Sequence, residues 1–561
     1  MRHWRINLIL LFTILIAATI ASRLFFLQVI KNEYYGALAK GQQIIYSSWE
    51  GDRGEIFLKN QKLAVATTKN YSFVYLDPSE VALTDKEATA QSLSGILSLN
   101  KSTILSKLGH DSLYELLKKK LSDQEIEDLE AANLTGVHLG QEKMRSYPFA
   151  EFASHLLGFV NQEGQGQYGL EEYWQDTLSG KESFIESERG PWGYFSLSAD
   201  DISQSKGSDL YLTIDYNIQY FAEKLLEKAK TNYEAIDGTI IVADPKTGKV
   251  LALASFPEFD PNNYTQEKDL GIFQSDAVEK VFEPGSVFKP LTMAAALDQN
   301  KITPQTTYID EGLVKIGTYT IYNYGQRTYG ENTMTQVLEK SINTGAVFAE
   351  RQVGDANFLK YVEKFGVFEK TGIDLAGEIA SANKELKNGR EINYATASFG
   401  QGVELTPIQL VRVFSAIANG GKLVKPFVVE KIVNGEKVKV IEPEVSKEQI
   451  ISSDTASKLT AMLVSVVENG YSKKAQVPGY YVAGKTGTAQ ISYAALGINQ
   501  KGYSDHTYQS FIGFAPAFDP QFIILIKLNN PQTNTAEYSA IPLFQELAKY
   551  IIDYYQIAPD Y

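Results

Sequence analysis

Three short polar segments constrain the fold of this chain more than any other feature of its sequence. The first spans residues 286–289, the second 341–343 and the third 485–488. In that order they supply a hydroxyl nucleophile with a basic amine one helical turn away, a polar bridge, and a cationic strand edge. Neighbouring residues predict a helix at the first segment and a strand at the third. We therefore expect the chain to bring the start of a helix to the edge of a sheet.

The first segment, Ser286-Val287-Phe288-Lys289, is selected by its context. The same serine–lysine spacing recurs elsewhere in the chain. Residues 286–289, however, follow a Pro-Gly turn signal and precede a run of helix formers. Side chains three apart on a helix face the same way, with Cβ atoms about 5–6 Å apart, so we expect Lys289 to reach the Ser286 hydroxyl. Taken alone, the tetrapeptide would more often be a serine cap followed by a solvated lysine.

The third segment begins at Lys485, within residues 479–490. These residues predict a strand, with glycines where another backbone or a ligand comes close. Two other Lys-Thr-Gly triplets, at residues 246–248 and 370–372, are predicted to form a hairpin turn and a loop.

The second segment, Ser341-Ile342-Asn343, follows a predicted helix over residues 334–340. Alone, it would be interpreted as a helix C-cap with an asparagine. Because all three segments occur in order, with helix and strand contexts at the outer two, the functional interpretation is favoured.

The ordered set resembles the active-site signature of class B penicillin-binding proteins, which are monofunctional peptidoglycan D,D-transpeptidases. The resemblance extends over nearly the whole chain. Within the family, residues 283–286 and 510–513 resemble the septal, cell-division type, and the elongation type is the alternative. Residues 57–61 depart from the family's usual Asp-Arg-Asn-Gly turn, which weakens the assignment to a type. Further similar stretches are residues 53–56, 145–148, 155–158, 169–171, 398–402, 406–409 and 511–516.

The resemblance implies a role for each polar residue of the three segments. Ser286 would attack the penultimate D-alanine of a stem peptide, and backbone N–H groups of Ser286 and Thr488 would form the oxyanion hole. The implied catalytic residues are Ser286, Lys289, Ser341, Asn343 and Lys485. The implied substrate-binding residues are Thr486, Gly487 and Thr488.

Composition narrows the chemistry and the partners. The chain has no cysteine, which excludes thiolate metal sites, and five histidines without paired metal spacing. Serine–lysine chemistry needs no histidine, and we expect no metal and no cofactor because the implied mechanism needs neither. The net charge of −14 argues against nucleic acid. The resemblance implies stem peptides, β-lactams, and a polytopic glycosyltransferase within the division or elongation machinery as partners.

The N-terminus predicts a membrane anchor. Basic residues precede an uncharged stretch over residues 6–22, and apolar character continues to residue 30 past Arg23. About 20 apolar residues span a bilayer, and the preceding basic residues predict a cytoplasmic N-terminus. We expect cytoplasmic residues 1–5, a single transmembrane helix over 6–30 in the cell (inner) membrane, and an extracytoplasmic catalytic domain. A cleaved signal peptide is the alternative.

The remaining chain is expected to form two α+β parts. Residues 31–210 resemble the family's elongated pedestal, with a helix over residues 113–129 and a linker near residues 205–209. Residues 211–561 are expected to form the penicillin-binding transpeptidase domain, a mixed sheet with helices on its faces. Its predicted helices are residues 217–230, 454–468 with Ser453 as N-cap, and 543–555; its predicted strands are residues 239–243, 250–255, 509–514 and 522–528.

Other functions remain open at the level of sequence. A membrane-anchored β-lactamase or D,D-carboxypeptidase would use the same nucleophile. The commonest serine β-lactamases, however, carry an E-x-x-L-N segment, which is missing between residues 344 and 484. A non-catalytic β-lactam sensor or division scaffold is the second alternative, although such a scaffold would be expected to have lost Ser286 or Lys289.

Overall fold

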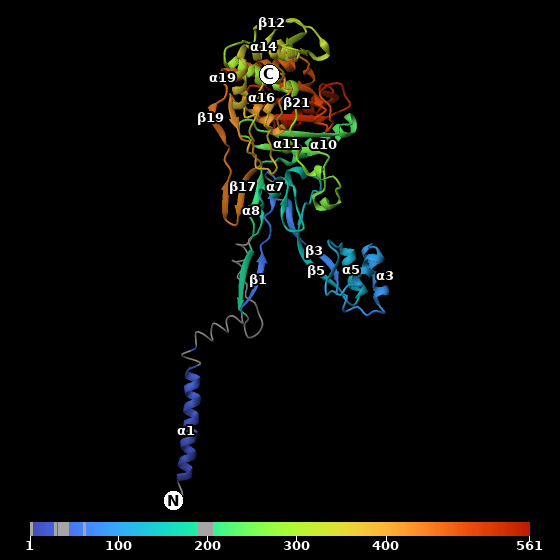
Figure 1. The fold of residues 1–561 in the computed structure, drawn as a ribbon, viewed down its shortest axis with the longest axis vertical. Helices are drawn as coiled ribbons and strands as arrows, with labels where there is room; N and C mark the ends of the chain where they lie inside the picture. The colour runs from blue at the N-terminus through green and yellow to red at the C-terminus, as the bar shows by residue number, and fades with distance from the viewer. Residues whose placement is uncertain (1–3, 27–30, 32–43, 60–62, 181, 189–205) are drawn as a thin grey trace. The chain divides into compact units, whose positions relative to one another are not determined.

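The computed structural model describes residues 4–26, 31, 44–59, 63–180, 182–188 and 206–561 (Figure 1). The chain divides into two compact units. One comprises Met1–Arg53 with Ser179–Ser208, and the other comprises Gly54–Leu178 with Asp209–Tyr561.

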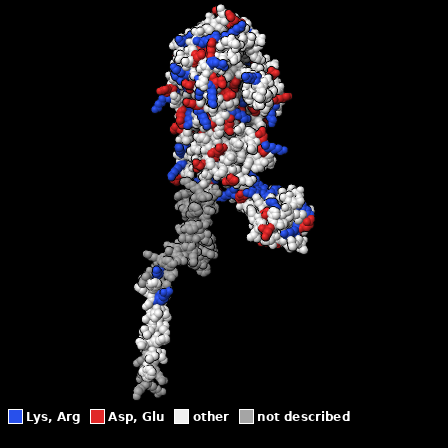
Figure 2. All heavy atoms as spheres, viewed as in Figure 1, with Lys and Arg blue, Asp and Glu red and all other residues white. Residues whose placement is uncertain are grey.

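The first unit contains one long apolar helix, α1 (Trp4–Phe25). Within the described ranges, its portion Leu8–Phe25 is the one stretch long and apolar enough to cross a membrane, and Figure 2 draws it almost free of charged atoms. The hydroxyls of Thr13 and Thr19 donate to the carbonyls of Ile9 and Leu15, so neither needs another partner in an apolar surrounding. Residues 27–30 of the predicted span lie outside the described residues. The same unit contains the antiparallel strands β1 (Ile44–Glu50) and β8 (Glu182–Glu188).

The second unit opens with a mixed sheet. Its order is β18-β17-β9-β2-β3-β4, with β5 also paired to β3. The β2–β9 pair is parallel and the others are antiparallel. The strands are β2 (Ile56–Phe57), β3 (Ala64–Leu76), β4 (Glu115–Lys118), β5 (Val137–Ser146), β9 (Asp209–Leu212), β17 (Val429–Asn434) and β18 (Lys437–Val440).

Three helices pack beside β3 and β5, namely α3 (Lys86–Leu97), α4 (Lys101–Leu108) and α5 (Asp123–Ala132). The prediction of one helix over residues 113–129 is wrong. Residues 115–118 pair with β3 instead, and α5 starts only after Ser122, whose side chain forms a capping box with Glu125. Strand pairing with a distant segment therefore overrides the local helix pattern of leucine, lysine and glutamate.

A five-stranded sheet, ordered β11-β10-β22-β21-β20, forms the centre of the C-terminal part. Helices α10 and α20 pack on one face, and α11, α12, α18 and α19 share a core with the other. The predicted α+β class is confirmed. The strands are β10 (Asp237–Ala243), β11 (Val250–Phe256), β20 (Ala483–Ser492), β21 (Tyr503–Ala515) and β22 (Phe522–Asn529); the helices are α10 (Tyr216–Tyr233), α11 (Asp276–Glu279), α12 (Lys289–Asp298), α18 (Pro407–Ala418), α19 (Ser453–Glu468) and α20 (Ala540–Tyr555).

Most predicted elements of this part are confirmed. Residues 217–230, 454–468 and 543–555 lie within α10, α19 and α20. The predicted cap of α19 is wrong by one residue, because Ser452 accepts from the N–H of Thr455 while Ser453 is already helical. Residue 205, at the start of the predicted linker, lies outside the described residues.

Smaller elements complete the second unit. Between β5 and β9 lie α6 (Ser154–Leu157), β6 (Phe159–Val160), β7 (Gly166–Gln167), α7 (Gly169–Tyr173) and α8 (Gln175–Leu178). Between β11 and β20 lie η2 (Pro261–Gln266), η3 (Leu270–Phe273), η4 (Gly285–Phe288), β12 (Thr307–Asp310), β13 (Leu313–Ile316), β14 (Tyr319–Tyr322), η5 (Tyr324–Gln326), β15 (Gly330–Thr333), α13 (Met334–Glu339), α14 (Asn343–Val353), α15 (Asp355–Lys364), α16 (Lys384–Lys387), α17 (Glu391–Ala397), β16 (Lys422–Val424), β19 (Val445–Gln449) and η6 (Lys473–Ala475).

Candidate active site

Ser286 lies in a tight turn that runs directly into a buried helix. The turn is the 3₁₀ segment η4, and α12 begins at Lys289. Gly285 has φ 58° and its N–H donates to the Gly400 carbonyl at 3.0 Å, a left-handed conformation that favours glycine. All residues of α12 except the last are buried, as expected for a helix that is apolar on every side. Side chains at i and i+3 eclipse one another in a 3₁₀ turn, so Ser286 and Lys289 project together.

Lys289 is fully buried and surrounded by hydroxyl and carbonyl oxygens. Its Nζ lies 3.0 Å from Ser286 Oγ, 2.6 Å from the Ser341 carbonyl oxygen and 3.2 Å from Ser341 Oγ. Burial and then the charge of Lys485 hold the pKa of Lys289 well below its usual range. The structure therefore favours a neutral amine beside the Ser286 hydroxyl.

Ser341 reaches Lys289 because α13 ends in a Schellman motif. Ser341 adopts φ 56°, its N–H donates to the Leu338 carbonyl, and the N–H of Ile342 donates to the Val337 carbonyl. The interpretation of Asn343 as the C-cap is therefore wrong: Ser341 takes the left-handed position and Asn343 starts α14. The motif turns both the carbonyl and the hydroxyl of Ser341 towards Lys289.

Lys485 approaches the same hydroxyl from the sheet. Its Nζ donates to Ser341 Oγ at 3.0 Å and to the Thr486 carbonyl at 3.1 Å. Burial lowers the pKa of Lys485 to about 7. No acidic side chain in the described part of the chain forms an ion pair with either lysine, so two buried amines share one hydroxyl without a counter-charge.

The three oxygens around Lys289 Nζ can accept from the three N–H groups of a charged ammonium, and they also fit a neutral amine. Such an amine has two N–H donors and one lone pair. In the neutral amine, the lone pair can accept from Ser286 Oγ–H, while the two N–H groups donate to the carbonyl and hydroxyl oxygens of Ser341. Ser341 Oγ then accepts from both lysines, and its own proton is available for a third group. This arrangement provides a proton path from Ser286 through Lys289 to Ser341.

The other predicted residues lie on the same elements but make different contacts. Asn343 Nδ2 donates to the Tyr322 carbonyl at 3.0 Å. Thr486 Oγ1 accepts from Lys485 Nζ at 3.3 Å, and Thr488 Oγ1 accepts from the N–H of Ala536 at 3.3 Å. Along β20, residues 485, 487 and 489 are buried while 486 and 488 are partly open, so both threonine side chains project away from the buried face.

Sequence reasoning missed the network that supports the second segment. Asp310 is buried and accepts from Thr344 Oγ1 at 2.6 Å and from Asn323 Nδ2. The side chain of Asn323 in turn accepts from the N–H of Thr344 at 3.1 Å. This network fixes the start of α14 to the segment that contains β13 and β14. No short motif marks Asp310, because its partners come from three separate stretches of chain.

Gly487 permits close contact between β20 and the nucleophile turn. A Cβ at this position would lie 2.8 Å from the Pro284 carbonyl oxygen and 2.6 Å from Ser510 Oγ. We expect Gly487→Ala to push β20 away from Ser286 and to slow acylation by penicillin roughly 10- to 100-fold. Stopped-time labelling with a fluorescent penicillin measures the rate. Gly95→Ala is the matched control, since a Cβ at Gly95 meets no heavy atom within 4 Å; equal rates for the two variants would contradict the close contact.

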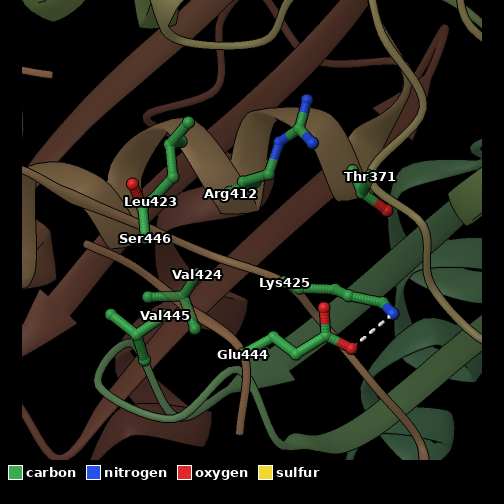
Figure 3. A pocket seen from close by; sticks show the side chains of 8 residues that line it. All are labelled: Thr371, Arg412, Leu423, Val424, Lys425, Glu444, Val445 and Ser446. Carbon is green, nitrogen blue, oxygen red and sulfur yellow. Dashed lines mark hydrogen bonds and ion pairs between the residues drawn. The ribbon is translucent and has the colours of Figure 1, made fainter. Parts of the chain in front are cut away.

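A pocket of about 270 Å³ lies apart from these residues, beside α18 and β16 (Figure 3). Lys425 in its wall donates to Glu444 at 2.8 Å. The Arg412 guanidinium donates to the carbonyls of Gly366, Glu369 and Lys370. These charged groups are engaged with the protein itself. Among the described residues, no group of three or more potential ligands could hold a metal ion.

Comparisons with known proteins place the three segments in a family context. Residues 238–549 match the model of the penicillin-binding protein transpeptidase domain. Residues 48–212 match that of the penicillin-binding protein dimerisation domain. The first match covers more than half of the chain.

Individual relatives align with almost the full length of this chain. Stage V sporulation protein D of Bacillus subtilis is 33% identical over 94% of this chain and 82% of its own length. A probable peptidoglycan D,D-transpeptidase, PbpC of Pseudomonas aeruginosa, is 30% identical over 94% of this chain and 91% of its own length. The structure of penicillin-binding protein 3 from Mycobacterium tuberculosis with ampicillin superposes with a TM-score of 0.70 at 25% identity, covering 91% of this chain and 97% of that one.

Proposed function

This chain belongs to the class B penicillin-binding proteins, and on that premise we propose the residues by which it cross-links peptidoglycan. It is a serine-type D,D-transpeptidase that binds β-lactams. The observation that carries the residue assignment is the position of Lys289 Nζ, 3.0 Å from Ser286 Oγ and hydrogen-bonded to Ser341. A serine needs a base within hydrogen-bond reach to become a nucleophile.

Acylation starts when Lys289 takes the Ser286 proton. Ser286 Oγ forms a bond to the carbonyl carbon of the penultimate D-alanine. The C–N bond to the terminal D-alanine then breaks, and the proton passes from Lys289 through Ser341 to the leaving amine. Backbone N–H groups of Ser286 and Thr488 stabilise the oxyanion, and one such donor is worth about 3–4 kcal/mol of barrier.

The same groups carry out deacylation, the second half of the reaction, with the proton transfers in the reverse direction. The amine of a second stem peptide attacks the ester carbonyl and gives up a proton to Lys289. Ser286 regains that proton as its ester bond breaks. Asn343 holds the substrate amide, Lys485 supplies positive potential, and the hydroxyls of Thr486 and Thr488 bind the terminal carboxylate while Gly487 allows close approach.

We further propose how the chain is organised in the envelope. Helix α1 anchors it in the cell membrane with residues 1–5 in the cytoplasm, and the transpeptidase domain, residues 211–561, lies outside it. Residues 31–210 form the pedestal. A septal role is favoured by residues 283–286 and 510–513. Membership of the family implies a polytopic glycosyltransferase as partner.

A cross-linking assay tests the proposed reaction. The full chain in detergent is given glycan strands whose stems end in D-alanyl-D-alanine, and mass spectrometry follows the products. We expect released D-alanine together with cross-linked stems. Tetrapeptide stems without cross-links would support the carboxypeptidase alternative. Penicillin should remain bound as a stable ester, because the chain lacks the E-x-x-L-N segment of the commonest serine β-lactamases; steady drug hydrolysis would support a β-lactamase.

A further inference from the structure

The segment leading into Ser286, residues 282–285, is hydrogen-bonded at both ends to a second loop. Phe282 and Leu405 exchange two backbone hydrogen bonds of 3.1 and 3.2 Å. The N–H of Gly285 donates to the Gly400 carbonyl. Residues 282–285 therefore lie along residues 400–405, with Glu283 between the two points of attachment.

The Glu283 carboxyl group connects this pair to a third element. Tyr503 Oη donates to its two oxygens at 2.9 and 3.2 Å, and the N–H of Gly402 also hydrogen-bonds to it. Tyr503 is the first residue of β21 and pairs with Ser492 of β20. One carboxyl group thus joins the nucleophile segment, the 400–405 loop and the strand pair that contains Lys485.

The strand pair β20–β21 also packs closely against the turn at residues 284–286, which contains Ser286. A Cβ at Gly285 would lie 2.9 Å from the Ala489 side chain, and one at Gly487 would meet the Pro284 carbonyl oxygen. Any shift of β20 relative to this turn changes the distance between Lys485 and Ser286. The hydrogen bonds from Tyr503 to Glu283 join β21 to the segment leading into Ser286, so they resist such a shift.

We propose that Glu283 and Tyr503 form a clamp that sets the position of Ser286 against β20, and that both are positioning residues for acylation. The proposal rests on the transpeptidase function proposed above. The clamp acts through hydrogen-bond geometry, since Glu283 is bonded to Tyr503 and Gly402 and not to either active-site lysine.

The electrostatic surroundings of Glu283 agree with a geometric role. Burial raises the pKa of Glu283 to about 7, the Tyr503 bond opposes that rise, and nearby Glu404 adds to it. Glu404 is itself held by the Ser381 hydroxyl at 2.9 Å. A neutral side chain with the same shape should therefore serve the clamp. In Glu283→Gln, the amide oxygen can accept from Gly402 and the amide N–H₂ can donate to the Tyr503 oxygen.

The experiment measures the rate of acylation of the full chain in detergent by a fluorescent penicillin, together with the melting temperature of each variant. We expect Glu283→Ala to acylate about 10-fold more slowly, because a small misplacement at a reacting centre is costly. Tyr503→Phe should be slowed several-fold while retaining its ring. Glu283→Gln should acylate within about twofold of the parent, because its amide can still hydrogen-bond to both Tyr503 and Gly402.

Tyr361→Phe is the matched control. Tyr361 also donates a phenol hydrogen bond to a carboxylate, Asp298 Oδ2 at 2.6 Å, but on helices outside the clamp, so its acylation rate should stay at the parent value. If Glu283→Ala does not fold, the acylation rates of Tyr503→Phe and Glu283→Gln still test the clamp. Parent-like rates for Tyr503→Phe, or a Glu283→Gln variant slowed about 10-fold, would overturn the clamp. A parent chain that is not acylated would instead overturn the proposed function.

Discussion

Lys289→Arg should slow acylation by penicillin by about 10²- to 10⁴-fold, the usual contribution of a general base. The arginine carries a positive charge and holds its proton at neutral pH, so it cannot accept the Ser286 proton. Lys289 can, because burial and Lys485 hold its pKa well below the usual value. A loss of this size would show that Lys289 acts as a base and not merely as a positive charge.

The dependence on pH gives this prediction a second readout. A lysine with a lowered pKa loses its proton at a lower pH than usual, so Lys289 can act as a base at neutral pH. The parent chain should therefore acylate rapidly at neutral pH. It should slow on acidification, because Lys289 becomes protonated. Raising the pH should not restore the arginine variant. The melting temperature must be compared as well, since Lys289 is fully buried and a longer side chain costs packing energy. Acylation of a folded Lys289→Arg chain at the parent rate would assign the base to another residue.

Ser286→Ala should abolish the penicillin adduct altogether. The substitution removes one hydroxyl from a turn whose backbone is held by Gly400 and whose helix is fully packed, so the fold should persist. The other hydroxyl that contacts Lys289, Ser341 Oγ, accepts from both lysines at 3.0 and 3.2 Å. It is therefore not expected to replace Ser286 as nucleophile.

The parts of the site that follow from short-range rules were predictable. Ser286 and Lys289 are three residues apart at the start of a helix, so their proximity depends on one turn of backbone. Strand β20 was predictable from the glycine-containing pattern of residues 479–490. By contrast, Ser341 meets Lys289 only because a Schellman motif turns its carbonyl, and Asp310 meets Thr344 across 34 residues. Such contacts depend on tertiary packing, which no local pattern encodes.

The wrong helix prediction and the rejected C-cap interpretation have the same origin. Residues 113–129 satisfy the helix pattern, but residues 115–118 find a partner in β3 that lies far away in the sequence. Asn343 has the composition of a C-cap, yet Ser341 takes the left-handed position because Ile342, fully buried, supplies the apolar residue of the motif. In both cases contacts made in the folded chain, strand pairing in the first and burial of Ile342 in the second, decide between two locally acceptable structures.

Peptide mapping of the penicillin adduct tests the central claim most directly. The full chain is incubated with penicillin, digested and analysed by mass spectrometry, with Ser286→Ala treated in parallel. We predict a single covalent adduct on the peptide containing Ser286 and none in the variant. An adduct of equal yield in the Ser286→Ala chain, or one located on a different serine of the parent, would contradict the assignment of Ser286 as the nucleophile.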